Sequence, residues 1–105
     1  MADSMLREHA VRDIKHLAAA LGRQSEAAGE RFIDMALATL EAVAERPTMG
    51  RIVRCRHPNF RNARVCPVRG FRWALLVYLE TSAGVEGIRI LHGASELAAW
   101  LGERT

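Results

Sequence analysis

Lysine is nearly absent from this sequence, and acidic residues are absent from one central stretch. Lys15 is the single lysine beside fourteen arginines, and no aspartate or glutamate occurs between Arg46 and Arg72. That segment contains eight arginines, whereas the rest of the chain has seven basic and twelve acidic residues, a balance of −5. Because arginine binds phosphate and carboxylate groups bidentately, this asymmetry favours an anionic partner over a merely solvated surface.

Long apolar runs and an export signal are also missing. The absence of an 18-residue apolar run predicts no transmembrane helix, and the N-terminus has no signal-peptide pattern. The two cysteines are therefore expected as reduced thiols in a cytoplasmic protein. Cys55, His57 and Cys66 lack the paired ligand spacing of a zinc site, so we expect no metal and no cofactor. The length of 105 residues indicates one domain over residues 1–105.

A β-hairpin is predicted in the C-terminal half. Its first strand has an apolar side chain at every second position, as one continuous apolar face requires, namely Phe71, Trp73, Leu75, Val77 and Leu79. Residues 81–84 are expected to form the turn and residues 87–92 the second strand, in which Ile88 and Ile90 alternate with Arg89 and Leu91. We expect the rest of the chain to cover this hairpin.

Two amphipathic helices are predicted before the hairpin. Apolar residues recur at three- and four-residue steps between residues 9 and 22. Ser25 is a natural N-cap for a longer helix, which ends near Arg46 because Pro47 disfavours helix in the preceding residue. The short connection indicates an antiparallel helical hairpin. The apolar stripe of the longer helix is predicted as Ile33, Ala36, Leu37, Leu40, Val43 and Ala44, with Phe32 beside it.

Weaker signals predict the remaining elements. Residues 5–7 form at best a short edge strand, and residues 51–56 a short extended piece. Residues 63–68 are a plausible strand, in which Pro67 indicates a sheet edge or a bulge. Ser95 is expected to cap a last short helix with one apolar face, formed by Leu97, Trp100 and Leu101.

This order predicts an α+β fold, with the helical hairpin packed on one face of a small, mostly antiparallel sheet of three to four strands and a short C-terminal helix. The opposite sheet face is then expected to be a mixed surface of the kind found at interaction sites, displaying Arg72, Leu76, Tyr78, Arg89 and Leu91.

Several motifs occur together between residues 27 and 101. The long helix leads into a Pro-x-x-Gly-Arg element, which consists of Pro47, Gly50 and Arg51. A second element runs into the strand that begins with Phe71 and Arg72, and it contains Arg64, Pro67, Val68 and Gly70. The closing strand ends in His92 and Gly93 ahead of a short helix, and outside this range residues 10–13 read AVRD. In this combination the chain resembles the ParE branch of the ParE/RelE toxin superfamily, the toxins of type II toxin–antitoxin (plasmid stabilisation) modules.

The resemblance implies a RelE/ParE-like fold, a co-encoded antitoxin and, for the ParE branch, DNA gyrase as the poisoned target. RelE-like members instead cut mRNA in the ribosome. For such an endoribonuclease, His92 would be the general acid, and Arg69, Arg72 and Arg89 would neutralise phosphate charge. The single tyrosine lies in mid-strand rather than near the C-terminus, so we favour the ParE-like alternative without catalytic residues.

Two departures from the family pattern leave a third alternative open. The first strand is weak, and Ser95-Glu96 stand where the family commonly has Arg-Asp. A degenerate member would bind an antitoxin without harming the cell. His92 is alternatively a structural histidine, and Trp100 is alternatively the anchor of its own helix.

An arginine-rich flank beside a half-apolar sheet face suits an extended acidic segment that folds on binding, as an antitoxin does. We expect no membrane contact and no sequence-specific DNA binding, and RNA or ribosome contact only for a nuclease. The residues predicted to bind the target or the antitoxin are Arg64, Arg69, Arg72, Leu76, Tyr78, Arg89, Leu91 and Trp100.

Overall fold

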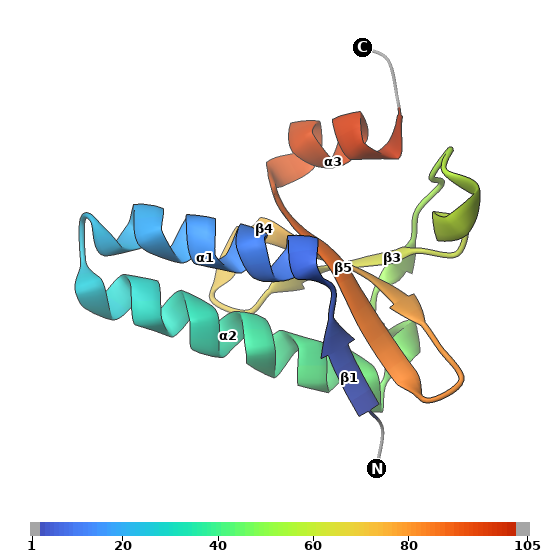
Figure 1. The fold of residues 1–105 in the computed structure, drawn as a ribbon, viewed down its shortest axis with the longest axis horizontal. Coiled ribbons are helices and arrows are strands. Elements are labelled where there is room, and N and C mark those ends of the chain that lie inside the picture. Colours follow the sequence, from blue (N-terminus) through green and yellow to red (C-terminus); the bar gives the residue numbers. More distant parts are fainter. Residues whose placement is uncertain (1–2, 103–105) are drawn as a thin grey trace.

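A computed structural model describes residues 3–102, and its elements form the predicted α+β fold (Figure 1). The elements are β1 (Asp3–Leu6), α1 (Glu8–Gly22), α2 (Glu26–Glu45), β2 (Arg51–Ile52), β3 (Arg64–Val68), β4 (Phe71–Glu80), β5 (Gly84–His92) and α3 (Gly93–Leu101). The sheet has five strands in the order β1-β5-β4-β3-β2, where three to four were predicted. Only β1, which runs parallel to β5, departs from antiparallel pairing.

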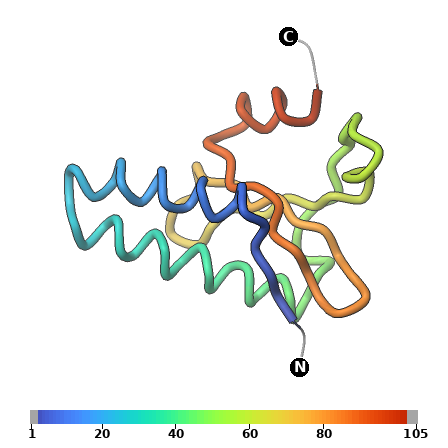
Figure 2. The backbone as a smooth tube through the Cα atoms, viewed as in Figure 1, coloured from blue at the N-terminus to red at the C-terminus, as the bar shows by residue number. Residues whose placement is uncertain are grey.

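The helices α1 and α2 lie side by side over one face of the sheet (Figure 2). The Ser25 side chain caps α2 by accepting a hydrogen bond from the Ala28 backbone N at 3.3 Å, as predicted. At Gly29 the two helices are so close that a Cβ atom would lie 2.7 Å from the Ala18 carbonyl oxygen. Glycine at this position therefore permits the close packing of the helical hairpin.

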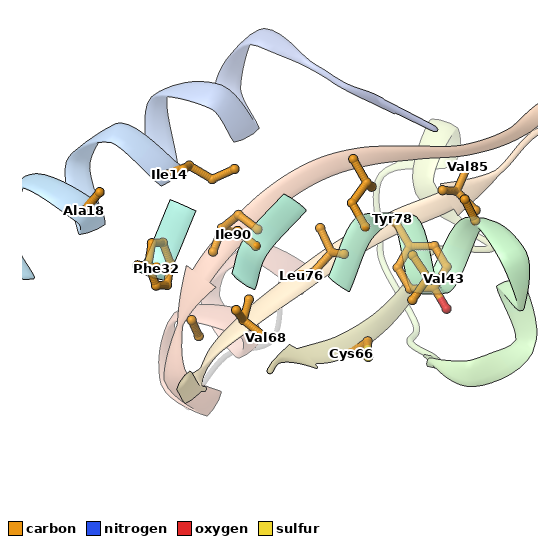
Figure 3. Close-up of a cluster of buried hydrophobic side chains, with 14 residues drawn as sticks. Ile14, Ala18, Phe32, Val43, Cys66, Val68, Leu76, Tyr78, Val85 and Ile90 are labelled. Atoms are coloured by element: carbon orange, nitrogen blue, oxygen red, sulfur yellow. The ribbon is translucent and has the colours of Figure 1, made fainter. Parts of the chain in front are cut away.

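The helical hairpin covers the sheet face that contains Leu76 and Tyr78, both 0% exposed (Figure 3). The prediction that this face is exposed is therefore wrong. The other face is also buried, because Leu97 and Leu101 of α3 pack there in a second cluster with Leu91. The alternation of side chains along a strand shows which residues share a face of the sheet. When both faces are apolar, the sequence does not show which face the helices cover.

The apolar stripe of α2 is rotated relative to the prediction. Phe32 is 0% exposed and Leu40 is 4% exposed, whereas Ile33 and Leu37 are 38% and 42% exposed. Thr39 lies in the buried stripe, where its hydroxyl donates to the Met35 carbonyl oxygen at 2.7 Å. A helix with apolar residues on both sides of Phe32 allows either orientation, and the packing selects one.

Two irregularities shape the sheet. The β3–β4 register shifts between Pro67 and Val68, which confirms the bulge that Pro67 indicated. Across β4 and β5, Val77 pairs with Arg89 and Tyr78 with Gly87, so Ile88 is the extra residue of a bulge. This bulge ends the predicted alternation of β5, since Ile88 and Leu91 enter one cluster and Ile90 the other.

The last helix begins earlier than predicted. Gly93 has a φ of 81°, in the left-handed region that favours glycine, and it leads from β5 directly into α3. His92 occupies the N-cap position without a side-chain cap, and Ser95 lies inside the helix, so the predicted Ser95 cap is wrong. None of the helices within residues 3–102 has the length and apolar character that crossing a bilayer requires.

Candidate partner-binding surface

The connection after α2 is held in place by two side chains from the sheet. Tyr78 donates its hydroxyl hydrogen to the Pro47 carbonyl oxygen at 2.7 Å and accepts from the Gly50 backbone N at 2.8 Å. Arg64 donates from Nη1 to the Gly50 carbonyl oxygen, also at 2.7 Å. A Cβ atom at Gly50 would lie 2.5 Å from the Tyr78 hydroxyl oxygen, so this close contact requires glycine. The Pro-x-x-Gly-Arg element therefore fixes the position at which Arg51 enters β2.

The roles of Tyr78 and Arg64 follow from this geometry. Tyr78 is 0% exposed, and burial raises the pKa of its hydroxyl, so the group stays protonated and continues to donate to Pro47. Arg64 is half-buried, with one nitrogen committed to Gly50. Both side chains were predicted to contact a partner; Tyr78 is instead buried, whereas Arg64 is partly exposed and also supports the connection.

An open cavity of about 500 Å³ lies beside this connection, and we refer to it as the edge groove. Its walls combine apolar side chains with two exposed guanidinium groups. Met49 is 45% exposed, and Arg51 and Arg72 are both exposed. The lining residues are Met49, Arg51, Val65, Cys66, Pro67, Arg72, Leu75 and Ala94.

The sheet edge beside the edge groove is largely open. β2 pairs with β3 at two positions only, Arg51 with Val65 and Ile52 with Arg64. Within residues 3–102, no strand pairs with the outer edge of β3 beyond Val65. Burial raises the pKa of the Cys66 thiol on this strand, which keeps it protonated and makes it a weak nucleophile. The site therefore offers an unpaired strand edge and no activated thiol.

The arginines of residues 46–72 are not neutralised within the described part of the chain. None of the eight forms an ion pair there, and all except Arg64 are exposed. By contrast, Arg7 pairs with Glu86 and Arg89 pairs with Asp13. The positive charge of these exposed arginines is therefore available to an anionic partner.

Arg89 and His92, two residues of the nuclease alternative, contact other parts of the fold. Arg89 donates to the Asp13 carboxylate from Nε at 2.7 Å and from Nη2 at 3.2 Å. The centroid of the exposed His92 ring lies 4.9 Å from that of Trp73, which is half-buried and stacks on Phe32.

The other two residues of that set are on the surface. Arg69 is exposed, and its backbone N donates to the Thr39 hydroxyl at 3.1 Å, so the β3–β4 turn is attached to α2. Arg72 lines the edge groove. No hydrogen bond joins any two side chains of Arg69, Arg72, Arg89 and His92, all of which are described.

Three of the predicted partner-binding residues, Leu76, Tyr78 and Leu91, are 0% exposed. The predicted exposure of these three side chains is wrong, because both sheet faces are covered. Trp100 is half-buried and stacks on Phe60 with 5.5 Å between ring centroids. Sequence reasoning missed Met49 as a groove residue, although the Pro-x-x-Gly-Arg element that exposes it was recognised. The described residues contain no cluster of three or more His, Cys, Asp or Glu side chains that could hold a metal ion.

A helical hairpin on a five-stranded sheet, with a short third helix on the other face, is a RelE/ParE-like toxin fold. Residues 5–97 match the family described as ParE toxin of type II toxin-antitoxin system, parDE. The chain therefore belongs to this toxin family, and the sequence-based assignment is confirmed. A search of curated proteins found no match.

Proposed function

We propose that this ParE-family toxin binds and poisons DNA gyrase and is neutralised by a co-encoded antitoxin. Membership of a family of type II toxin–antitoxin toxins supports the existence of an antitoxin partner. The edge groove is the observation that carries the antitoxin assignment, because it joins an open strand edge, apolar walls and two arginines that pair with no carboxylate of residues 3–102.

An extended acidic segment of the antitoxin fits this site by its chemistry. Its backbone adds to the unpaired edge of β3, and its apolar side chains contact Met49 and Leu75. Its carboxylates form charge-assisted hydrogen bonds with Arg51 and Arg72. Tyr78 and Arg64 contribute indirectly by fixing the connection that positions Arg51.

We assign the gyrase contact to the exposed Arg69 and Arg72 and to the half-buried Trp100. A toxin that acts by binding needs exposed side chains rather than an assembled set of catalytic groups. The ion pair of Arg89 with Asp13 and the contact of His92 with Trp73 support this non-catalytic alternative, because both side chains have structural partners.

Induction of the chain alone in a bacterial host tests the target. DNA content, supercoiling and mRNA integrity are followed together. Gyrase-linked DNA breaks with intact mRNA are the expected result. Ribosome-dependent mRNA cleavage that is lost in His92→Ala would identify the endoribonuclease alternative instead. Normal growth with the folded protein present would identify the antitoxin-binding remnant suggested by Ser95-Glu96.

A paired set of variants tests the edge groove. Arg51→Gln with Arg72→Gln is expected to weaken antitoxin binding by about a hundredfold or more, because each of the two lost charge-assisted hydrogen bonds contributes about 1.5–3 kcal/mol. Arg12→Gln with Arg23→Gln removes the same charge from exposed positions on the helical hairpin and serves as the control. Equal losses in both variants would show that net charge, and not the edge groove, determines affinity.

A further inference from the structure

A second part of the arginine-rich segment forms a separate surface, the arginine loop, which we define as residues 53–63. It protrudes between β2 and β3, away from the connection of the helical hairpin (Figure 1). Its exposed side chains include Arg54, Arg56 and Arg61, and none of the three forms an ion pair with a described carboxylate.

The arginine loop is fixed in shape by its own hydrogen bonds. The Val53 backbone N donates to the Ala63 carbonyl oxygen at 2.9 Å, which closes the loop, and both residues are buried. Inside it, the Asn59 backbone N donates to Nδ1 of His57 at 3.2 Å. The Arg56 backbone N donates to the Leu101 carbonyl oxygen at 3.3 Å, which attaches the loop to α3. The arginine side chains are therefore presented from an ordered backbone, which lowers the entropic cost of binding.

The aromatic rings of the loop are engaged within the protein. Phe60 stacks on Trp100, and the ring of His57 lies 4.8 Å from Phe60. The Arg7 guanidinium carbon lies 5.4 Å from the Phe60 ring centroid. These contacts hold the loop against α3. The guanidinium groups of the loop are therefore the groups that it exposes to a partner.

The arginine loop differs from the edge groove in having no exposed apolar anchor. The large hydrophobic residues that are exposed in the described part of the chain are Met5, Ile33, Leu37, Met49 and Ile52, all outside residues 53–63. A disordered acidic peptide needs buried apolar side chains to offset the entropy of ordering. A nucleic-acid backbone needs none, because counterion release supplies most of the free energy.

We propose that the arginine loop binds the sugar–phosphate backbone of a nucleic acid, with Arg54, Arg56 and Arg61 on successive phosphates. Backbone contacts position a protein without reading bases, so binding is independent of sequence. Residues 53–63 contain these three arginines and no aspartate or glutamate, and the nearby Glu86 is already paired with Arg7. The loop therefore remains positive as a whole.

Fluorescence anisotropy with the full chain tests the proposal, using a labelled DNA duplex of about 20 base pairs and a single-stranded RNA of about the same length. With three phosphate contacts, affinity for the duplex is expected to fall about 40-fold between about 50 and 200 mM salt, from a slope of about 0.9 per phosphate. A preference for either probe identifies which nucleic acid is bound, and either one supports the proposal.

Substitution of the three arginines locates the site. Arg54→Gln, Arg56→Gln and Arg61→Gln together keep the Cβ and Cγ methylenes, including those of Arg56 beside Gly102, and are expected to weaken binding about tenfold or more at low salt. The control is Arg12→Gln, Lys15→Gln and Arg23→Gln, which removes the same charge from exposed positions of the helical hairpin. The arginine-to-lysine triple variant, which keeps the charge, is expected to retain most of the binding.

Three results would overturn the proposal. The first is the absence of salt-dependent binding to either probe by the folded protein. The second is an equal loss in the loop variant and its control, which would assign binding to net charge. The third is displacement of the nucleic acid by polyglutamate at an equal concentration of charge, which would assign the loop to an acidic protein. None of these measurements involves gyrase or an antitoxin, so their outcome is independent of the proposed function.

Discussion

The carboxylate of Asp13 accepts hydrogen bonds from the Arg89 side chain and, at 2.9 Å, from the Ile90 backbone N. β1 pairs with β5 only as far as Gly87, so the Ile90 N–H lies beyond the end of that pairing. Asp13 therefore provides the acceptor for the Ile90 N–H at the outer edge of β5, beyond the residues of β5 that β1 pairs with. The same contact attaches α1 to the sheet.

Asp13→Asn is expected to lower the free energy of unfolding by about 3 kcal/mol, because it leaves a largely buried arginine without its counter-charge. The Asp13 and Arg89 side chains are 14% and 19% exposed. Arg7→Gln is the control, with an expected loss of at most about 1 kcal/mol, because the Arg7 and Glu86 side chains are 41% and 23% exposed. Urea unfolding measures both, and equal losses would contradict the assignment.

Tyr78→Phe is expected to lower the free energy of unfolding by about 1–3 kcal/mol, because the buried Gly50 N–H loses its acceptor. Urea unfolding at neutral pH measures this loss. A loss below about 0.5 kcal/mol would show that another group replaces the hydroxyl.

Tyr78 also predicts a pH dependence. Burial raises the pKa of its hydroxyl above the ordinary value of 10.0. Its contribution to stability is thus complete below pH 10.0 and is lost as the pH rises toward the higher folded-state value, since the unfolded state ionises first. The Cys66 thiol, with an ordinary pKa of 9.0 that burial raises, acts in the same direction. Urea unfolding from pH 7 upward in a Cys66→Ala background isolates the contribution of Tyr78 to the pH dependence of stability. That contribution is expected to be absent when Tyr78→Phe is added.

At the scale of elements, local signals predicted the helices well. Ser25 and Pro47 mark the ends of α2, and both act within one helical turn. Which face of α2 is buried depends instead on contacts with distant strands, so the sequence placed Ile33 and Leu37 in the core where Phe32 and Thr39 lie. β1 was only weakly indicated, because its partner is 81 residues away in the register Asp3 with Gly84.

Two leucines of α2 provide a test of its orientation. Leu40→Ala is expected to cost about 2–5 kcal/mol, because the side chain is 4% exposed in the core. Leu37→Ala, the same substitution at a 42% exposed position, is expected to cost about 1 kcal/mol or less. Thermal or urea unfolding distinguishes them, and similar losses in both variants would restore the stripe predicted from the sequence, which contains both leucines.

At the scale of the whole molecule, charge is separated along the chain. α2 carries five acidic residues and one arginine, whereas the arginine-rich segment that follows carries no acid. This separation was visible in the sequence. The sequence did not show that the arginine-rich segment forms two surfaces, an edge groove with apolar walls and an arginine loop without exposed apolar anchors. This division depends on packing, which exposes Met49 and buries Leu76.

The isolated protein is expected to be poorly soluble, and co-expression with its antitoxin is expected to rescue it. Met49 and Ile52, 45% and 58% exposed, adjoin an open strand edge, which favours pairing with other chains. The soluble fraction after expression with and without the neighbouring gene measures the effect. A highly soluble monomer expressed alone would count against an antitoxin that covers this edge.

The pairing of β1 with β5 has a consequence for biosynthesis. The first strand acquires its partner only after β5 has been translated, and so does Asp13, whose contacts lie 76 and 77 residues further along. At about 5–20 residues per second, a nascent chain spends several seconds without either contact. A transcript truncated before β5 thus yields a peptide that lacks the strand between β1 and β4, so we expect the complete sheet to form only in nearly complete translation products.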